Sequence, residues 1–193
     1  METVIKTKIS ELNLHDLNKN IFEIMPDIVD DIKCRLIKNP QIKIDGVTAH
    51  QRRSVGFFSD ESLGYQYNWK YIKSQFLPEG LKYLLKYINA KFKSDFNGVL
   101  VNYYVNGNEY IRKHSDDDKK LHNIEVILIS YGATRKIRIR EKKTNKIVKD
   151  VLIKQNNIIQ MSGGFQNEFT YEIPIEKKVK DSRYSFIFRR HFK

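Results

Sequence analysis

Two pairs of residues in the second half of the chain have the types and the spacing to bind a metal ion and a small anion. His114 and Asp116 are separated by one residue, so on a β-strand their side chains would share a face and could bind one side of a metal ion. Arg183 and Arg189 are six residues apart and, on a strand, would also point to one side. Because guanidinium groups match carboxylates in shape and charge, the two arginines predict a site for a dicarboxylate.

Together the two pairs favour an oxygenase that uses non-haem Fe(II) and 2-oxoglutarate, in which three protein ligands leave open positions on the metal. Each pair also has a plainer interpretation. His114 begins an acidic segment that continues through residues 116–118 and could be a solvated turn. The two arginines could lie on the outer face of an edge strand, with the aromatic residues between them in the core. If the arginines instead line an interior, an anion must neutralise them.

The spacing of apolar residues predicts helices first and strands afterwards. Segments 20–39, interrupted at Pro26, and 78–92 have apolar residues at helical spacing. From Val99 the period changes to two, and strands are predicted over Val99–Val105, Ile124–Ser130, Lys136–Arg140, Ile147–Ile153, Ile158–Met161, Phe169–Ile173 and Tyr184–Phe188. Short strands without intervening helices favour a mainly β fold with flanking helices. We predict a double-stranded β-helix, or jelly roll, over residues 41–193, braced by an N-terminal helical extension over residues 1–40.

Length and composition limit the class of protein. The 193 residues suffice for one domain with a full core, and a single cysteine, Cys34, rules out a disulfide within the chain. The N-terminal segment lacks the apolar run of a secretion signal, and no stretch is apolar enough to span a membrane. We therefore expect an intracellular protein, cytoplasmic or nuclear and not secreted, and a monomer. The net charge of +12 favours either simple solubility or a polyanionic partner.

Several motifs occur in the order and spacing of one known family. From about Ile42 to Arg189 the chain resembles the AlkB family of nucleic-acid dealkylating dioxygenases. That family carries Asn-x-Tyr, His-x-Asp twelve residues after the Asn, Ser-x-Gly, Met-x-Gly and Arg-x5-Arg. The corresponding segments here are Asn102-Tyr103-Tyr104, His114-Ser115-Asp116, Ser130-Tyr131-Gly132, Met161-Ser162-Gly163 and Arg183 to Arg189.

The resemblance implies roles for individual residues. His114 and Asp116 would bind Fe(II), and the 2-oxoglutarate co-substrate would be held by Asn102, Tyr104, Arg183 and Arg189. Residues 40–75 resemble the family's nucleotide-recognition lid. In the substrate site, Asp118 would contact the target base, Tyr67 and Tyr65 would stack on a flipped base, and Arg53 would lie nearby. The implied reaction is oxidative dealkylation of alkylated bases in DNA or RNA.

The chain departs from the family at the third metal ligand. The family has a histidine three residues before a proline, and here Tyr171 stands in that place before Pro174. A phenol has a pKa near 10 and is a poor ligand for Fe(II), whereas a phenolate formed at a metal would favour Fe(III). Tyr171 could bind and retune the metal, or water or another histidine could complete the site. The best-placed histidine is His122, ahead of His191 and His50.

Loss of catalysis is a third outcome of this departure, and it leaves three function classes open. The first is a dealkylating dioxygenase with Fe(II) and 2-oxoglutarate. The second is a catalytically silent relative that binds nucleic acid, and the third is an oxygenase acting on a protein or a small molecule. Lys136, Arg138 and Arg140 alternate with isoleucines and could contact phosphates, or they could form a solvated strand face.

Overall fold

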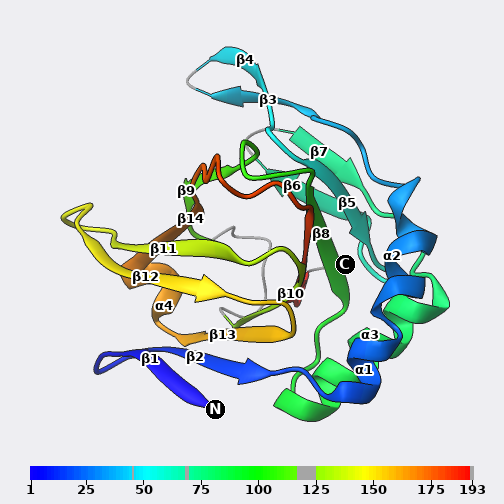
Figure 1. Cartoon of the computed structure of the whole chain (residues 1–193), viewed down its shortest axis with the longest axis horizontal. Coiled ribbons are helices and arrows are strands. Elements are labelled where there is room, and N and C mark those ends of the chain that lie inside the picture. Colours follow the sequence, from blue (N-terminus) through cyan, green and yellow to red (C-terminus); the bar gives the residue numbers. More distant parts are fainter. Residues whose placement is uncertain (45, 68–69, 117–124, 192–193) are drawn as a thin grey trace.

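Two antiparallel sheets packed face to face form the body of the chain, whose computed structural model describes residues 1–44, 46–67, 70–116 and 125–191 (Figure 1). The large sheet has the strand order β1 (Glu2–Lys6), β2 (Ser10–Asp16), β13 (Asn157–Gly163), β10 (Val126–Gly132), β15 (Arg183–Arg189), β8 (Gly98–Tyr104) and β5 (Ser54–Phe58). The small sheet has the order β12 (Ile147–Ile153), β11 (Arg135–Glu141), β14 (Phe169–Ile173) and β9 (Ile111–His114). This arrangement confirms the predicted jelly roll.

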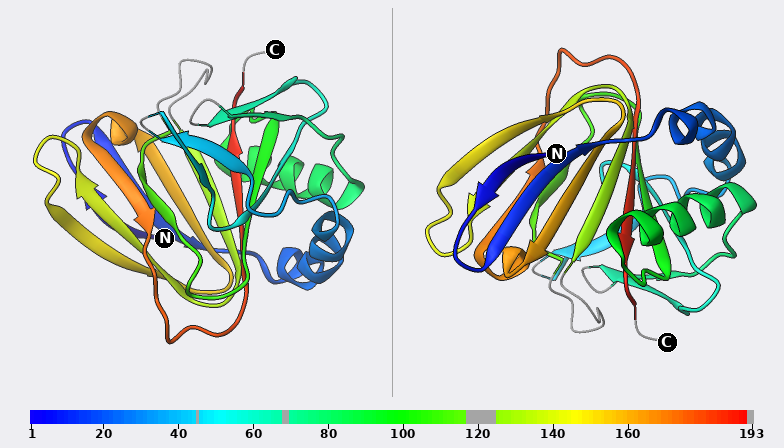
Figure 2. Two further views of the ribbon diagram at one scale, coloured as in Figure 1. Left: turned by 90° about the horizontal axis from the view of Figure 1, so that it is seen from above. Right: turned by 90° about the horizontal axis from the view of Figure 1, so that it is seen from below.

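Helices and two hairpins surround the sheets. The helices are α1 (Lys19–Glu23), α2 (Met25–Lys33), α3 (Glu79–Phe92) and α4 (Phe165–Glu168). One hairpin consists of β3 (Gln41–Ile44) and β4 (Val47–His50), and the other of β6 (Gly64–Tyr67) and β7 (Lys70–Lys73). Figure 2 shows α1, α2 and α3 gathered on one side of the large sheet, with β11, β12 and β14 on its other side. None of the helices in the described ranges has the length and apolar character needed to cross a bilayer.

The large sheet is buried on both faces and therefore has two cores. Ile187 of β15 packs in the core between the sheets, with Leu128 and Ile137. The neighbouring residues Phe186 and Phe188 point the other way and pack against the helices. Alternation along β15 thus sends aromatic residues toward the helices, as expected, and Arg183 and Arg189 toward the small sheet. Because β15 lies between β10 and β8, the alternative of a solvated edge strand is wrong.

The prediction of a helical extension over residues 1–40 is wrong in its first half. Residues 2–6 and 10–16 are strands, and β2 pairs along its length with β13 of the large sheet. Leu12 is completely buried in the core between the sheets, so this segment is part of the jelly roll. The alternation of Leu12 and Leu14 has the period of a strand. The helical prediction holds from Lys19 to Lys33, with a break at Ile24, and Pro26 lies in the first turn of α2.

Strands predicted over 147–153 and 169–173 coincide with β12 and β14, and α3 begins and ends at the predicted residues. The Ser-x-Gly motif has a local physical reason at the end of β10. Gly132 has a φ of 98°, and a Cβ added there would lie 2.4 Å from the carbonyl oxygen of Ser182. Only glycine fits this close approach, which keeps β10 and β15 in register at their ends.

Candidate active site

Residues from six strands line one narrow cavity between the two sheets. Its lining includes the predicted residues Asn102, Tyr104, His114, Asp116 and Tyr171. Asn102 and Tyr104 come from β8, Tyr171 comes from β14, and His114 ends β9. The two arginines of β15 are buried beside it, each with no more than 1% of its surface exposed. Residues predicted from separate motifs are therefore close together in space.

Both carboxylate oxygens of Asp116 are held by protein groups. Oδ1 accepts from Nη1 of Arg189 across 2.8 Å, and Oδ2 accepts from the hydroxyl of Tyr171 across 2.7 Å. The backbone N–H of Asp116 donates to the side-chain oxygen of Gln166 at 2.8 Å. The carboxylate thus has a fixed orientation although it lies beyond the last residue of β9. Arg189 thus contacts Asp116, the carboxylate of the predicted metal-binding pair, and its contact with a dicarboxylate stays a prediction.

His114 presents the nitrogen that a metal needs. Its Nδ1 lies 2.9 Å from the carbonyl oxygen of Arg112, which can only accept, so Nδ1 carries the proton and the lone pair of the neutral ring lies on Nε2. Burial lowers the pKa of His114, against the opposing attraction of the Asp116 carboxylate. The neutral ring, which is the metal-binding form, is therefore favoured. Tyr171 is its direct neighbour across the β14–β9 pair, with 4.6 Å between ring centres.

The side chains fit a metal ion at two positions and depart from the usual set at the third. His114 and Asp116 supply an imidazole and a carboxylate, and the third group beside them is the phenol of Tyr171. No set of three His, Cys, Asp or Glu residues in the described ranges could hold a metal. His191 packs against Phe57 with ring centres 4.7 Å apart, and neither it nor His50 lines this cavity. His122 lies outside the described residues.

The other end of the site fits a carboxylate ligand. Arg183 is completely buried, and its Nε donates to Oγ of Ser130 at 2.9 Å. Neither terminal nitrogen makes a hydrogen bond of normal geometry to a described residue. Burial lowers the pKa of Arg183 to about 10, although nearby Tyr104 raises it. A buried guanidinium whose two terminal NH2 groups have no partner of normal geometry among the described residues is matched by a carboxylate that binds through both oxygens.

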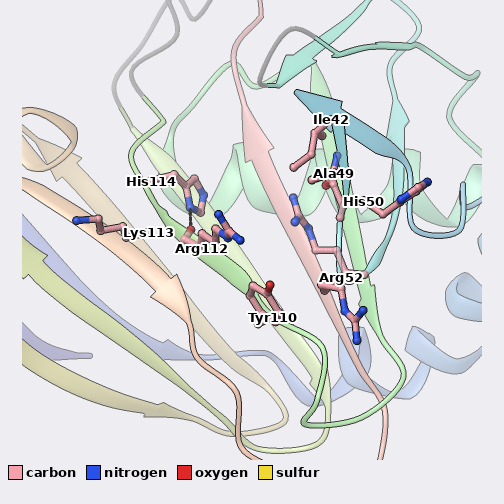
Figure 3. Close-up of a pocket in the computed structure, with 10 residues that line it drawn as sticks. Ile42, Ala49, His50, Arg52, Tyr110, Arg112, Lys113 and His114 are labelled. Carbon is pink, nitrogen blue, oxygen red and sulfur yellow. Dashed lines mark hydrogen bonds between the residues drawn. The ribbon is translucent and has the colours of Figure 1, made fainter. Parts of the chain in front are cut away.

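Arg53 connects the lid segment to this end of the site. It is buried, and its Nε donates to Oδ1 of Asn102 at 2.8 Å. Arg53 also lines a second, outer pocket together with His114, Tyr110 and Arg112 (Figure 3). It therefore stands between the inner cavity and the outer pocket.

Of the other residues predicted to contact the substrate, two lie in a described strand and one lies outside the described residues. Tyr65 and Tyr67 lie on β6, paired with Ile72 and Lys70 of β7. Asp118 lies outside the described residues. The segment over residues 40–75 consists of the two hairpins and β5 between them, so it has a regular β-structure of its own.

Sequence reasoning missed Arg135, a buried residue at the start of β11. Its guanidinium binds Glu176 at 3.1 Å and donates to the carbonyl oxygens of Glu109 and Pro174 at 2.9 and 2.8 Å. The sequence does predict its burial, because side chains two residues apart on a strand share a face, and Ile137 and Ile139 are buried. Gln166, which fixes Asp116, gave no comparable signal.

The cationic face predicted on β11 is paired with acidic groups. Lys136 and Arg138 bind Asp150 at 3.3 and 2.8 Å, and Arg140 binds Glu172 at 3.0 Å. These three side chains therefore belong to ion pairs within the sheet. The structure favours the interpretation of a solvated strand face over a phosphate-binding one.

Comparisons with known proteins agree with this geometry. The model of the 2OG-Fe(II) oxygenase superfamily matches residues 17–189. DNA oxidative demethylase ALKBH2 is 28% identical in Mus musculus over 104 residues (49% of this chain, 43% of that protein) and 22% identical in Homo sapiens over 146 residues (72% and 56%). Alpha-ketoglutarate-dependent dioxygenase alkB homolog 3 of Rattus norvegicus is 27% identical over 103 residues (49% and 35%).

The chain spans about half or less of the length of these curated relatives. The solved structure of OsALKBH1 has a TM-score of 0.58 and 16% identity, and the match covers 93% of this chain and 97% of that one. This similarity supports the jelly-roll fold. Family and relatives indicate a 2-oxoglutarate-dependent dioxygenase, and the family uses Fe(II) and 2-oxoglutarate. Since the family model covers nearly the whole sequence, the chain belongs to the 2OG-Fe(II) oxygenase superfamily as an AlkB-like member.

Proposed function

We propose that this chain binds Fe(II) and 2-oxoglutarate between its two sheets and oxidatively dealkylates alkylated bases in DNA or RNA. The observation that carries the proposal is the cavity itself. Tyr104, which lies beside the buried, partly unsatisfied guanidinium of Arg183, lines this cavity, and so do His114 and Asp116. The names of the mammalian relatives, DNA oxidative demethylases, support the choice of substrate.

In this proposal Arg183, Tyr104 and Asn102 bind 2-oxoglutarate. Arg183 receives a carboxylate on its two terminal nitrogens, and its Nε remains on Ser130. Asn102 can donate through its amide nitrogen while its oxygen is held by Arg53. Arg189 orients Asp116 through Oδ1 and adds positive charge for the same dianion. Burial of these groups excludes water, which strengthens each charged hydrogen bond.

His114, Asp116 and Tyr171 would hold the metal. When bound, iron and 2-oxoglutarate would supply the oxidising power of O2, with 2-oxoglutarate converted to succinate and CO2 and the alkyl group released as an aldehyde. The Tyr171 hydroxyl now donates to Oδ2 of Asp116, so metal binding at that oxygen requires the phenol to lose its proton or turn away. This competition is expected to weaken Fe(II) binding relative to a site with a second imidazole.

The substrate would approach from the outer pocket. Arg52, Arg112 and Lys113 line this pocket with His114, and their charge suits a phosphate backbone. We assign residues 40–75 to the lid over a flipped base, with Tyr65 and Tyr67 as stacking residues and Asp118 as a base contact. A monomer suffices for this arrangement.

The test of the proposed function is succinate production. The purified chain is incubated with Fe(II), 2-oxoglutarate, O2 and oligonucleotides that carry a methylated base, and succinate and unmodified base are measured together. We expect the two products in a 1:1 ratio, and His114→Ala should abolish both. Turnover with a peptide or small molecule and none with any methylated strand would contradict the assigned substrate.

A second candidate, a catalytically silent nucleic-acid binder, is favoured by the hydrogen bond between Tyr171 and Asp116. Anaerobic Fe(II) titration of wild type, Tyr171→His and Tyr171→Phe separates the two. If the phenol limits metal binding, the histidine variant binds Fe(II) at least tenfold more tightly and turns over faster. After oxidation of the loaded samples to Fe(III), a visible phenolate-to-iron absorption band that is present in wild type and absent in the phenylalanine variant would establish tyrosine as a ligand. Oligonucleotide binding without metal binding or succinate would support the silent binder.

A further inference from the structure

Gln51 is a buried residue at the junction of the lid and the jelly roll. It lies between the end of β4 and the start of β5, and only 2% of its surface is exposed. Its backbone N–H donates to the carbonyl oxygen of Pro40 at 2.9 Å, and its own carbonyl accepts from the side chain of Asn39 at 2.9 Å. The backbone is thus anchored on both sides, which fixes where the side chain begins.

The side-chain amide of Gln51 has no hydrogen-bond partner among the described residues. Both Nε2 and Oε1 are buried, and neither bonds to any residue in the described part of the chain. Burying an amide in this way destabilises a fold, so buried polar groups nearly always have partners. An amide left in this condition beside a pocket is matched by a ligand that offers one acceptor and one donor next to each other.

Gln51 lines the outer pocket that also contains His114. Arg52, Arg112 and Lys113, labelled in Figure 3, line the same pocket, and among the residues that the structure describes none of the lining side chains is an aspartate or glutamate. The described part of the pocket wall thus combines positive charge, Gln51 and the predicted metal-binding histidine. These features suit a base that is attached to phosphates and presents a polar edge.

We propose that Gln51 reads the edge of the target base and makes adenine the preferred base. Oε1 would accept from the exocyclic amine and Nε2 would donate to the adjacent ring nitrogen, the pair of bonds that glutamine makes with N6 and N7 of adenine. This inference rests on the proposed function. In 1-methyladenine that edge is intact, whereas in 3-methylcytosine the ring nitrogen beside the amine carries the methyl group. Gln51 can therefore make two bonds to the first base and one to the second.

The experiment compares kcat/KM for two oligonucleotides that differ only in carrying 1-methyladenine or 3-methylcytosine. We expect wild type to prefer 1-methyladenine by roughly tenfold, in line with one extra base contact. Gln51→Leu should bring the ratio close to one, and Gln155→Leu, at an exposed position, should leave it unchanged. Because Gln51→Leu removes two unpartnered polar atoms, its Tm should equal or exceed that of wild type.

Two results would overturn the role of Gln51. An unchanged base ratio in Gln51→Leu would do so, and so would a clear fall in Tm, which would make the amide a structural group. If neither oligonucleotide is turned over, the proposed dealkylation fails, and the same pair is compared by fluorescence anisotropy. A wild-type preference for binding 1-methyladenine that is lost in Gln51→Leu would then sustain the inference, while equal affinities would refute it.

Discussion

Two arginines beside one tyrosine behave in opposite ways. The guanidiniums of Arg135 and Arg183 each lie 5.6 Å from the ring centre of Tyr104, and each side chain is at most 1% exposed. Every nitrogen of Arg135 donates to the protein, including the Glu176 carboxylate. Among the described residues, the hydrogen bond of normal geometry that Arg183 makes is the one to Ser130. Both arginines are buried, and they differ in how many of their nitrogens donate to the protein.

The largest effect is expected for Arg135→Leu. This change leaves Glu176 and three carbonyl oxygens without their donor, and breaking a buried ion pair costs about 3–5 kcal/mol of unfolding free energy. Urea denaturation followed by circular dichroism measures the loss. Arg138→Leu is the control, because its pair with Asp150 is partly exposed and should contribute about 1 kcal/mol or less. Equal losses in the two variants would contradict the structural role of Arg135.

Arg183→Leu should separate stability from ligand binding. The variant replaces an unsatisfied buried cation with an apolar side chain, so the unfolding free energy should stay the same or rise. Affinity for 2-oxoglutarate should fall about 100-fold, since two charged hydrogen bonds are lost. Isothermal titration calorimetry under anaerobic conditions measures the second quantity. A loss of stability as large as that of Arg135→Leu would remove the distinction between the two arginines.

The smallest effect is expected at the residue that the two arginines share. Tyr104→Phe keeps the ring between the guanidiniums and removes the hydroxyl. Because one hydrogen bond to a charged group contributes about 1.5 kcal/mol, affinity for 2-oxoglutarate should fall about tenfold, with little change in stability. Calorimetry and thermal unfolding of the same samples test this. A large fall in Tm with unchanged affinity would assign the hydroxyl to the fold instead of the co-substrate.

Much of the fold could be predicted because its signal is local. Alternation in β12, β14 and β15 follows directly from which side chains must be buried. The first two strands were missed because β2 is stabilised by pairing with a distant strand, and single apolar residues such as Leu12 and Leu14 are a weak pattern by themselves.

For the site, motif spacing predicted residues that the structure places around one cavity, but it did not predict the hydrogen bonds between them. The contact between Tyr171 and Asp116 depends on the register of β14 against β9 and on the path of the chain after His114. Register is set by packing across both sheets, which no short motif specifies. Arg135 shows the reverse case. Its position two residues before Ile137 predicts that its side chain shares the buried face of the strand, but the cationic residues around it hid this pattern.

The pairing of β2 with β13 constrains how this chain reaches its final form. Asp16 and Asn157, neighbours in that ladder, are 141 residues apart in sequence. During synthesis the first strands emerge long before their partner exists, and closing so large a loop is entropically costly. We expect β1 and β2 to join the sheet late, with the apolar side of β2 exposed until the last third of the chain has left the ribosome.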